Sequence, residues 1–500
     1  MQINRLSPIE IKGNEFRKYG HQLIDKIADF IDDIYKKPVT LGETPKQIHS
    51  ILKSHHLSDE EGSVSELISN TADLLFTHSL LNGHPKFFGY ITSSAAPIGA
   101  LADLLAATVN PNVGANILSP IATEIEKQTI QWLSEFIGLP PGYGGIMVSG
   151  GNMANFTAFL AGRTAKAPEN IKQAGLAGIS APLIVYCSKA THTWIEKAVI
   201  LFGHGLDAIH WISTDAHNKM DVKELNMIIK SDLDKGFNPF MVVGTAGDVS
   251  TGVVDNLKSI AKVCTTYNLW FHIDGAYGAP AAGLPELKLI FDGISEADSI
   301  ALDPHKWLYS PLEAGCTLVK NPKHLSDTFS SHPDYYNFEN SDDDPAHNFY
   351  EYGLQNSRGF RALKVWLALQ QVGRIGYVKM ISEDIELSRL LYRLAENHPN
   401  LQAISQNLSI TTFRYIPSRL NDNIENMEAY LNELNEQLLN VLQAGGKLFL
   451  SNAVINEKYC LRACIVNFRT SKKDIEEVIE IIVDEGFKVN QKLQNGKNKS

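Results

Sequence analysis

The stretch that decides the fold is Asp303-Pro304-His305-Lys306-Trp307, which joins an apolar run at 298–302 to a second one at 315–319. Short runs of apolar or small residues bounded by turn residues predict buried strands. Lys306 is therefore expected on the turn that leaves the carboxyl end of a central strand, where open α/β sheets bind their ligands. A lysine held between His305 and Trp307 is poorly solvated, which makes its amine a candidate nucleophile. The same local sequence also fits a surface lysine whose stem packs on apolar groups while its amine reaches water. The rest of the chain has to decide between a surface lysine and a nucleophilic one.

The same alternation of strands and helices extends from about residue 85 to residue 375. Further apolar runs occupy 145–148, 183–186, 240–243 and 269–273. The stretches 153–163, 194–202 and 255–267 have helical spacing. Strands that alternate with helices predict an α/β fold with a mainly parallel sheet covered on both faces. A polar, turn-rich segment at 330–356 interrupts this pattern, and a loop of that length is usually functional.

The two ends of the chain differ from this central region. Residues 14–35 carry apolar side chains at helical spacing, and we expect this amphipathic helix to pack on a larger domain or on a second subunit. The C-terminal part predicts a smaller α+β unit, with a strand at 460–468 and a helix that starts after Ser471 and ends at Gly486. The expected division is an N-terminal helical segment (1–84), a large α/β domain (85–375) and a small C-terminal α+β domain (376–500).

Composition and charge exclude several classes of partner. The 500 residues are 44% hydrophobic and carry a formal net charge of −11, without a basic run. That acidic balance argues against nucleic acid or an anionic membrane surface as a partner. No run reaches the roughly 18 apolar residues of a membrane span, and the first residues lack the apolar core of a signal peptide. The five cysteines are scattered without a metal-binding spacing, so we expect reduced thiols, no metal site and a cytoplasmic protein.

Other predicted strand ends carry residues that are candidates for ligand binding or catalysis. Ser149-Gly-Gly-Asn152 opens a helix, and free backbone N–H groups at a helix N-terminus suit a phosphate. His192 opens a second helix, Gly244-Thr-Ala-Gly247 forms a small-residue turn, and Asp274 ends a strongly apolar strand. A carboxylate at the end of such a strand is costly to bury unless it meets a cation.

Taken together, these residues predict a site for pyridoxal 5′-phosphate. This cofactor needs a lysine for covalent attachment, an acid for its ring nitrogen, a phosphate cradle and flat packing on both ring faces. The chain supplies these four features, in the same order, with Lys306, Asp274, the turn at 150–152, and His192 together with Ala276. Because all of them are expected at strand carboxyl ends, they can converge on one crevice.

Longer motifs make the chain similar to a known family over nearly its whole length. They are His84-Pro-Lys-Phe-Phe-Gly-Tyr90, Ser119-Pro-Ile-Ala-Thr-Glu-Ile-Glu126, Ser149-Gly-Gly-Asn-Met-Ala-Asn155, His192-Thr-Trp-Ile-Glu-Lys-Ala198, His272-Ile-Asp-Gly-Ala-Tyr277, Asp303-Pro-His-Lys-Trp307 and Phe360-Arg-Ala-Leu-Lys-Val-Trp366. With these motifs the chain resembles the group II pyridoxal-phosphate decarboxylases, the family of the aromatic amino acid, tyrosine, tryptophan and glutamate decarboxylases. The resemblance implies the aspartate aminotransferase-like fold type I with a seven-stranded sheet. It also implies a homodimer in which the N-terminal segment packs on the partner subunit.

Carried over position by position, the resemblance implies a role for each matching residue. Lys306 would hold the cofactor as a covalent aldimine, and Asp274 would pair with the pyridine nitrogen. The other implied cofactor-binding residues are Gly151, Asn152, His192, Thr245, Ala276, Asp303 and His305. The implied catalytic residues are Lys306, His192 and a loop tyrosine, for which alignment on the preceding proline favours Tyr335 over Tyr336.

The implied substrate pocket favours an aromatic L-amino acid. By family position its walls are Phe88, Tyr90 and Ile91, with Ser357 in place of a glycine found in several aromatic-specific members. We therefore expect decarboxylation of tyrosine, phenylalanine, tryptophan or dopa to the amine and CO2. An acidic substrate (glutamate, aspartate or cysteine sulfinate) and an aldehyde synthase are the alternatives, and a sphingosine-phosphate-lyase-like carbon–carbon lyase is a more distant one. An aldehyde synthase would be favoured by phenylalanine at the loop position, so Tyr335 argues for simple decarboxylation.

Overall fold

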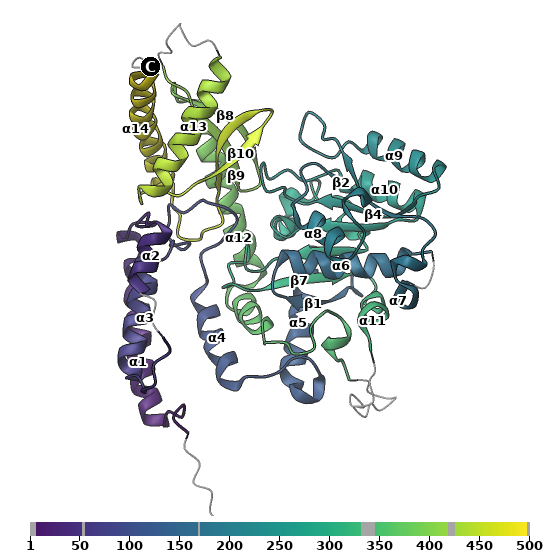
Figure 1. The fold of residues 1–500 in the computed structure, drawn as a ribbon, viewed down its shortest axis with the longest axis horizontal. Coiled ribbons are helices and arrows are strands. Elements are labelled where there is room, and N and C mark those ends of the chain that lie inside the picture. The colour runs from purple at the N-terminus through teal and green to yellow at the C-terminus, as the bar shows by residue number, and fades with distance from the viewer. Residues whose placement is uncertain (1–6, 53–55, 169–170, 332–345, 419–425, 498–500) are drawn as a thin grey trace, which may run out of the picture.

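A seven-stranded sheet forms the centre of the molecule in the computed structural model, which describes residues 7–52, 56–168, 171–331, 346–418 and 426–497 (Figure 1). Its strand order is β1-β7-β6-β5-β4-β2-β3. The strands are β1 (Gly144–Val148), β2 (Leu183–Ser188), β3 (Ile209–Ile212), β4 (Asn238–Thr245), β5 (Trp270–Asp274), β6 (Ser299–Leu302) and β7 (Gly315–Val319). Strand β7 runs antiparallel to both of its neighbours, whereas the pairs from β6 to β3 are parallel. The predicted mainly parallel seven-stranded sheet of fold type I is confirmed.

The sheet is buried on both faces, as the apolar strand sequences require. Side chains alternate between the faces of a strand, so a strand covered on both sides has to be apolar throughout. In β2, Leu183 and Val185 pack into one core with α6 (Gly151–Lys166), α8 (Trp194–Leu201) and α11 (Lys323–Phe329). Ile184 and Tyr186 pack into the opposite core with α5 (Pro120–Phe136), α9 (Val222–Asp234), α10 (Leu257–Tyr267) and α12 (Ala362–Glu396).

The pattern of apolar runs did not reveal strand β3. Its four residues, Ile209-His-Trp-Ile212, bury both isoleucines, whereas His210 and Trp211 are only half-buried. Such an edge strand pairs with one neighbour and is covered less completely than a central strand, so its sequence need not be apolar throughout.

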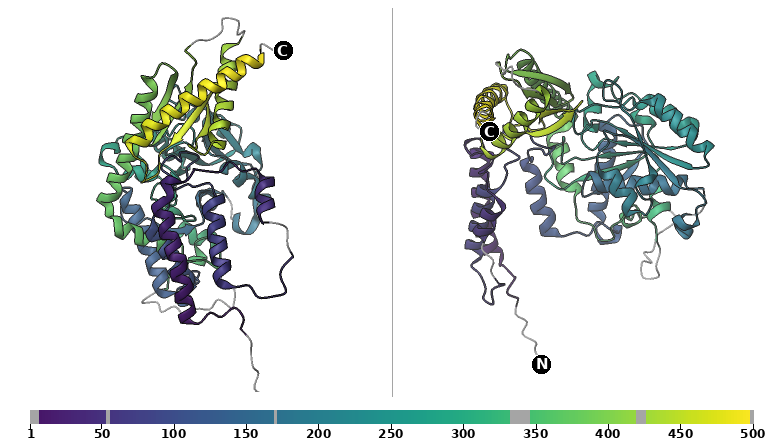
Figure 2. Two further views of the ribbon diagram at one scale, coloured as in Figure 1. Left: turned by 90° about the vertical axis from the view of Figure 1, so that its left-hand side faces the viewer. Right: turned by 45° about the horizontal axis from the view of Figure 1, so that its top comes forward.

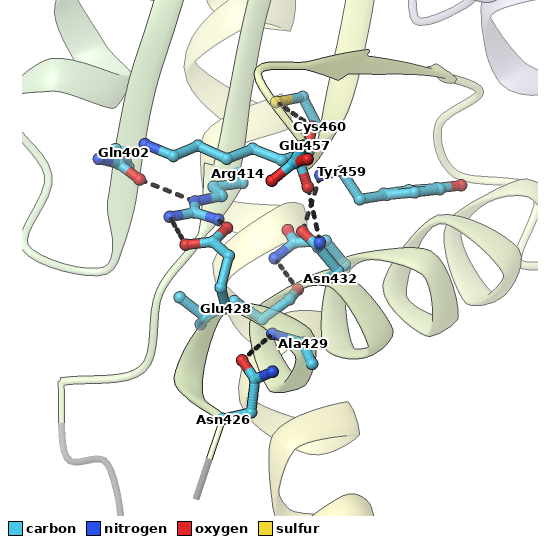
Figure 3. Close-up of polar contacts among 12 residues, drawn as sticks. Gln402, Arg414, Asn426, Glu428, Ala429, Asn432, Glu457, Tyr459 and Cys460 are labelled. Carbon is cyan, nitrogen blue, oxygen red and sulfur yellow. Dashed lines mark hydrogen bonds and ion pairs between the residues drawn. The ribbon is translucent and has the colours of Figure 1, made fainter. Parts of the chain in front are cut away.

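The small domain is a four-stranded antiparallel sheet in the order β10-β11-β9-β8, backed by two long helices. The strands are β8 (Leu401–Asn407), β9 (Ile410–Tyr415), β10 (Ser451–Ile455) and β11 (Lys458–Cys464), and the helices are α13 (Met427–Ala444) and α14 (Lys472–Lys497). Arg414 ties the sheet to the start of α13, because it donates to Gln402 on β8 and pairs with Glu428 on the helix (Figure 3). Asn432 in the same helix bonds the turn between β10 and β11, through the Glu457 carbonyl and the Tyr459 N–H.

The predicted end of the last helix at Gly486 is wrong, although its start is confirmed. Ser471 and Asp474 form the expected reciprocal cap at the N-terminus of α14. The helix then continues through Gly486 to Lys497. A Cβ atom at position 486 would lie 2.6 Å from the Tyr415 ring, so this glycine permits a close approach of helix and sheet and does not end the helix.

Two N-terminal helices, α1 (Gly13–Asp33) and α3 (Val64–His78), run side by side and project beyond the body of the molecule (Figures 1 and 2). The rings of Phe30 and Phe76 stack between them with centroids 4.3 Å apart. No residue of α1 is buried. Phe16, on the predicted apolar stripe, is exposed, and so is Ile24. The short α2 (Pro45–Leu52) joins these helices, and α4 (Pro97–Val109) follows them.

Helix α12 connects the large domain to the small one. Its backbone is interrupted at Gly373, where φ is 66° and ψ is 169°, a conformation that favours glycine. The division at 375/376 proposed from the sequence falls two residues after this break. Within the described parts of the chain, no helix combines the length and apolarity needed to span a membrane.

Candidate active site

A cavity of about 890 Å³ opens at the carboxyl ends of strands β1, β2, β4, β5 and β6. The parallel arrangement brings these strand ends to the same edge of the sheet, so residues as far apart in the sequence as Gly151 and Lys306 line one space. All nine predicted cofactor-binding residues line it: Gly151, Asn152, His192, Thr245, Asp274, Ala276, Asp303, His305 and Lys306. The residues that were predicted to converge on one crevice therefore do line a single cavity.

Lys306 lies on the turn after β6 and pairs with the buried carboxylate of Asp303. Its Nζ is 2.9 Å from Asp303 Oδ2, and its backbone N–H donates to the Asp303 carbonyl oxygen at 2.9 Å. Asp303 is 1% exposed, whereas the lysine side chain keeps 22% of its surface exposed. The turn thus presents an amine to the cavity beside a buried negative charge.

The turn between β1 and α6 needs glycine because other parts of the chain approach it closely. A Cβ atom at Gly151 would lie 2.7 Å from Asp303 Oδ2, and one at Gly315 would lie 2.6 Å from the Gly150 Cα. Helix α6 begins at Gly151 without a side-chain cap, so its first backbone N–H groups are free for an anion. This helix N-terminus fits the phosphate group of the cofactor.

Asp274 ends β5 with its carboxylate fixed by two hydrogen bonds. The Trp194 indole Nε1–H donates to Oδ2 at 2.8 Å, and the Ala276 backbone N–H donates to Oδ1 at 3.2 Å. Asp274 is 8% exposed and lines the cavity. A buried carboxylate in this place favours a cationic ligand group, such as a protonated ring nitrogen.

His192 stands at the mouth of the cavity, in the loop that precedes α8. Its Nδ1 accepts the Trp194 backbone N–H at 3.3 Å, so the neutral imidazole carries its proton on Nε2. Partial burial lowers the pKa of His192 below the ordinary value, and the nearby Lys306 adds to that effect. The imidazole is therefore neutral at pH 7, and it lines the cavity.

Thr245 at the end of β4 is held by a buried acid behind it. Asp255 accepts the backbone N–H groups of Thr245 and Met220 at 2.8 and 2.7 Å, and burial raises its pKa to about 6. The Thr245 hydroxyl lies in the cavity wall and has no hydrogen-bond partner among the described residues. A buried hydroxyl of this kind fits a polar ligand atom.

A hydrogen-bond network behind Lys306 fixes the turn to the small domain. Trp307 Nε1 and the Tyr309 hydroxyl both donate to Asp384 Oδ2 on α12, at 2.9 and 2.7 Å. Tyr277 stacks on Trp307 with centroids 5.0 Å apart, and its hydroxyl lies 2.6 Å from Ser409 Oγ. Burial raises the pKa of Asp384 to about 7.

The predicted substrate-binding residues separate into two groups. Tyr90 and Ile91 line the cavity. Phe88 does not, and this prediction has to be corrected: its side chain is fully buried in the small-domain core, because its backbone bonds Phe449 and Cys464 there. Ser357 is exposed and is likewise not part of the cavity wall of its own chain. Tyr335 and Tyr336 lie outside the described residues.

Arg462 is a cavity residue whose role the sequence did not reveal. It is 2% exposed on β11, and it donates to Ser451 Oγ at 3.0 Å and to the Tyr90 carbonyl at 3.3 Å. Its Nε has no acceptor among the described residues. The sequence contained one signal for this residue, because Arg462 lies within the apolar strand sequence 460–466. A charged side chain in such a strand needs a partner when it is buried.

Comparison with known proteins agrees with this geometry. The family model described as the pyridoxal-dependent decarboxylase conserved domain matches residues 45–416, and a model described as a PDXDC1-like second central domain matches residues 391–494. An aromatic-L-amino-acid decarboxylase of Bacillus atrophaeus is 33% identical over 476 residues, which cover 94% of this chain and 95% of the relative. A phenylacetaldehyde synthase of a Rosa hybrid cultivar is 29% identical, with 94% and 93% covered.

The fold has a close counterpart among solved structures. The Oryza sativa TDC structure with PLP and tryptamine superposes with a TM-score of 0.89 at 23% identity, over 97% of this chain and 99% of that one. The family model spans most of the chain, and the cavity holds the lysine, the acid and the glycine turn that the cofactor requires. The chain therefore belongs to the pyridoxal-dependent decarboxylase family, and it is a PLP-dependent amino acid decarboxylase.

Proposed function

We propose that this enzyme removes CO2 from an aromatic L-amino acid to give the corresponding amine. The observation that carries the proposal is the convergence of Lys306, Asp274 and the Gly150–Asn152 turn on one cavity whose outer wall includes Tyr90 and Ile91. The relatives named as aromatic-L-amino-acid and tyrosine decarboxylases support an aromatic substrate. A cavity of about 890 Å³ has the volume that a cofactor with a drug-sized ligand requires.

Each residue of the cavity has a distinct proposed task. Lys306 would hold the cofactor covalently, Asp274 would pair with the ring nitrogen, and the N-terminus of α6 would bind the phosphate group. Ala276 and His192 would pack against the ring, and Thr245, Asp303 and His305 would complete the cofactor site. When bound, pyridoxal phosphate supplies a ring that accepts the electron pair of the broken Cα–carboxylate bond.

We assign the final proton to Tyr335, with His192 as the residue that relays it. The neutral His192 carries its proton on Nε2 and can relay it, because its Nδ1 is occupied by the Trp194 N–H. General acid catalysis of this kind contributes roughly 10²- to 10⁴-fold. Tyr335 delivers its proton to the substrate Cα once CO2 has left.

Arg462 is proposed to bind a substrate carboxylate. Guanidinium groups pair with carboxylates through parallel N–H donors, and Arg462 keeps its Nε–H without an acceptor in the described cavity wall. In the aromatic proposal that carboxylate is the α-carboxylate. Binding of the α-carboxylate would orient the bond that breaks. Because every amino acid has an α-carboxylate, this contact would be common to all substrates.

Arg462 also favours a second candidate function, decarboxylation of an acidic amino acid. In that case the guanidinium would bind the side-chain carboxylate of glutamate, aspartate or cysteine sulfinate. The two assignments differ in what Arg462→Lys does to a panel of substrates. Binding of the α-carboxylate predicts that kcat/KM falls by a similar factor for every amino acid, whereas binding of the side chain predicts a loss for acidic substrates alone.

The experiment that tests the function is CO2 release from each of the twenty amino acids and dopa by the protein reconstituted with pyridoxal phosphate. The expected result is turnover of aromatic amino acids with equimolar amine. Preferred turnover of acidic amino acids would replace the first candidate with the second. No CO2 from any of them would remove both.

We further infer a homodimer in which two copies meet on an apolar face of the large domain. Large apolar side chains are exposed next to one another on α4, on the turn after it and at the start of α5: Leu101, Leu104, Leu105, Val109, Ile117, Leu118 and Ile121. Contiguous apolar patches of this kind mark interaction surfaces. The exposed stripe of α1 needs a similar cover, which a second copy provides.

This proposed dimer also gives Ser357 a place in a substrate site. Its neighbour Arg358 bonds the backbone of Val113, between α4 and α5, so Ser357 lies beside the same apolar face. We propose that Ser357 reaches the cavity of the partner subunit, which explains why it is exposed in its own chain.

A reducing compartment, and hence a cytoplasmic location, is proposed from the cysteines. All five are free thiols in buried positions, and burial raises the pKa of Cys460 and Cys464 to about 11. Titration of the native and unfolded protein with a thiol reagent should find no accessible thiol in the first and five in the second. Detection of a disulfide in protein isolated from its source would contradict the proposal.

A further inference from the structure

Trp194, the first residue of α8, contacts two of the proposed cofactor-binding residues at once. Its indole Nε1–H donates to Asp274 Oδ2 at 2.8 Å, and its backbone N–H donates to His192 Nδ1 at 3.3 Å. The backbone N–H belongs to the first turn of a helix, where no intrahelical acceptor exists, so the histidine satisfies it. One residue therefore links the acid expected at the ring nitrogen to the histidine expected on the ring face.

The indole is held rigidly in the core below the cavity. Trp194 is 0% exposed and belongs to the apolar cluster formed by α6, α8 and the face of the sheet that they cover. Its ring meets His272 edge to face, with centroids 5.7 Å apart and an interplanar angle of 86°. A donor that cannot move fixes the position of its acceptor, which is how a supporting residue orients a functional one.

The two hydrogen bonds to Asp274 leave the carboxylate with a defined orientation. The indole N–H binds Oδ2, and the Ala276 backbone N–H binds Oδ1. Among the described residues no cation forms an ion pair with Asp274, so its negative charge is available to a ligand. Loss of the indole donor would leave Oδ2 buried without a partner and the plane of the carboxylate free to turn about one remaining contact.

We propose that Trp194 is a positioning residue of the active site, which holds the Asp274 carboxylate in the orientation that binds the cofactor's ring nitrogen. This inference rests on the proposed role of Asp274. The motif at 192–198 does not by itself indicate this contact, because a tryptophan at the start of an apolar helix is most simply a core residue. The contact follows from packing between α8 and β5, which lie 80 residues apart in the chain.

The test is Trp194→Phe, which keeps an aromatic ring and the backbone N–H to His192 and removes the indole donor. A hydrogen bond to a charged group of this kind predicts a fall in kcat of roughly ten- to a hundredfold. KM for the amino acid should change less than kcat, because Trp194 does not line the cavity. The visible absorbance band of the bound cofactor should shift or weaken at constant pH, and the dissociation constant of pyridoxal phosphate should rise. A role in packing alone would change none of these spectral properties.

The matched control is Trp270→Phe. Trp270 is equally buried, on β5, and its indole N–H donates to Ser299 Oγ at 2.7 Å rather than to Asp274. Both variants should lose stability to a similar extent, and the control should retain the kcat and the cofactor spectrum of the parent protein within about twofold. Equal losses of kcat in the two variants would show that ring packing, and not the hydrogen bond, causes the effect.

A double-mutant cycle with Asp274→Asn separates this proposal from the one on which it rests. If the indole acts through the carboxylate, Trp194→Phe should have little further effect in the Asp274→Asn background, since contacting residues are not additive. Full additivity, or an unchanged kcat and spectrum in Trp194→Phe alone, would overturn the positioning role. If Asp274→Asn itself kept full turnover, the proposed role of Asp274 would fail first.

Discussion

Lys306 and Asp303 form a pair of opposite charges in the wall of the cavity. The carboxylate is almost completely buried, and the ammonium group 2.9 Å away is its partner. Removing one member of a buried pair leaves an uncompensated charge, which costs about 3–5 kcal/mol. The lysine therefore has two separable functions, one electrostatic and one covalent.

Lys306→Arg should separate these functions. The guanidinium keeps a positive charge beside Asp303 but stays protonated, so it cannot bond a carbonyl compound covalently. We expect borohydride to fix no cofactor on this variant, and turnover to fall on the order of a thousandfold or more. Mass spectrometry after reduction and an assay of CO2 release are the measurements.

Lys306→Ala is the companion variant, because it also removes the charge. Its free energy of unfolding should be lower than that of Lys306→Arg by about 3 kcal/mol, as Asp303 loses its partner. Equal stabilities for the two variants in urea would mean that the ion pair contributes nothing.

Tyr335→Phe should change the product rather than abolish the reaction. Without the hydroxyl proton donor, the substrate carbon is left open to dioxygen, and the products become aldehyde, CO2, ammonia and hydrogen peroxide. Tyr336→Phe is the control and should still give the amine. Quantification of amine and peroxide for both variants decides which tyrosine is the donor, and amine from both variants would assign the proton to another group.

At the level of elements, helix α12 holds the lysine turn in place through Asp384. This carboxyl group accepts hydrogen bonds from Trp307 and Tyr309, the first and third residues after Lys306, and it lies inside the interface of the two domains. The same interface contains the contact between Tyr277 and Ser409. Movement of the small domain would therefore be transmitted to the turn that carries Lys306.

Asp384→Asn should stabilise the protein at both pH values, but much more at pH 8 than at pH 5. Burial raises the pKa of Asp384 from the usual 3.8 to about 7, so between these values the folded state binds a proton that the unfolded state has lost. The stability of the parent protein is therefore reduced as pH rises through this window, by up to roughly 4 kcal/mol above pH 7. Both donors bind the same oxygen, which an asparagine carbonyl can replace.

The measurement is urea unfolding of both proteins at the two pH values. A difference in unfolding free energy that is the same at pH 5 and pH 8 would show that Asp384 does not titrate in this range. Asp384→Leu, which removes both acceptors, should be destabilised at either pH.

At the scale of the whole molecule, the apolar face on α4, the turn after it and the start of α5 is exposed in the isolated chain. Leu105 on α4 is 57% exposed, so replacing it should not disturb the fold of one subunit. If two copies meet there, a charge at this position would be buried without a partner.

Leu105→Glu should convert the dimer to a monomer and reduce turnover, because the proposed dimer contributes Ser357 to the partner's site. Met227→Glu is the control: Met227 is 63% exposed on α9, at the opposite end of the large domain (Figure 1). Sedimentation velocity of the parent and both variants is the measurement. A dimer that persists in Leu105→Glu would place the interface elsewhere.

The sequence by itself determined most of the sheet and most of the proposed cofactor site. Residues at the carboxyl ends of parallel strands meet at one edge whatever the details of packing, so Asp274 and Lys306 could be placed together from the order of apolar runs alone. The position of Gly150 and Gly151 at this edge was predictable too, because these residues join a predicted strand to a predicted helix. Local periodicity could not decide features that depend on neighbours, such as the weakly buried edge strand β3 or the passage of α14 through Gly486.

Only the tertiary structure decided which side chains from distant segments reach the cavity. Arg462 lines the cavity because the small-domain sheet packs against the segment around Tyr90, 372 residues earlier in the chain. Phe88 turns into the small-domain core for the same reason, and Trp194 reaches Asp274 only through the packing of α8 on β5. Burial and hydrogen bonding between distant segments depend on how whole elements pack, and a single stretch of sequence does not contain that information.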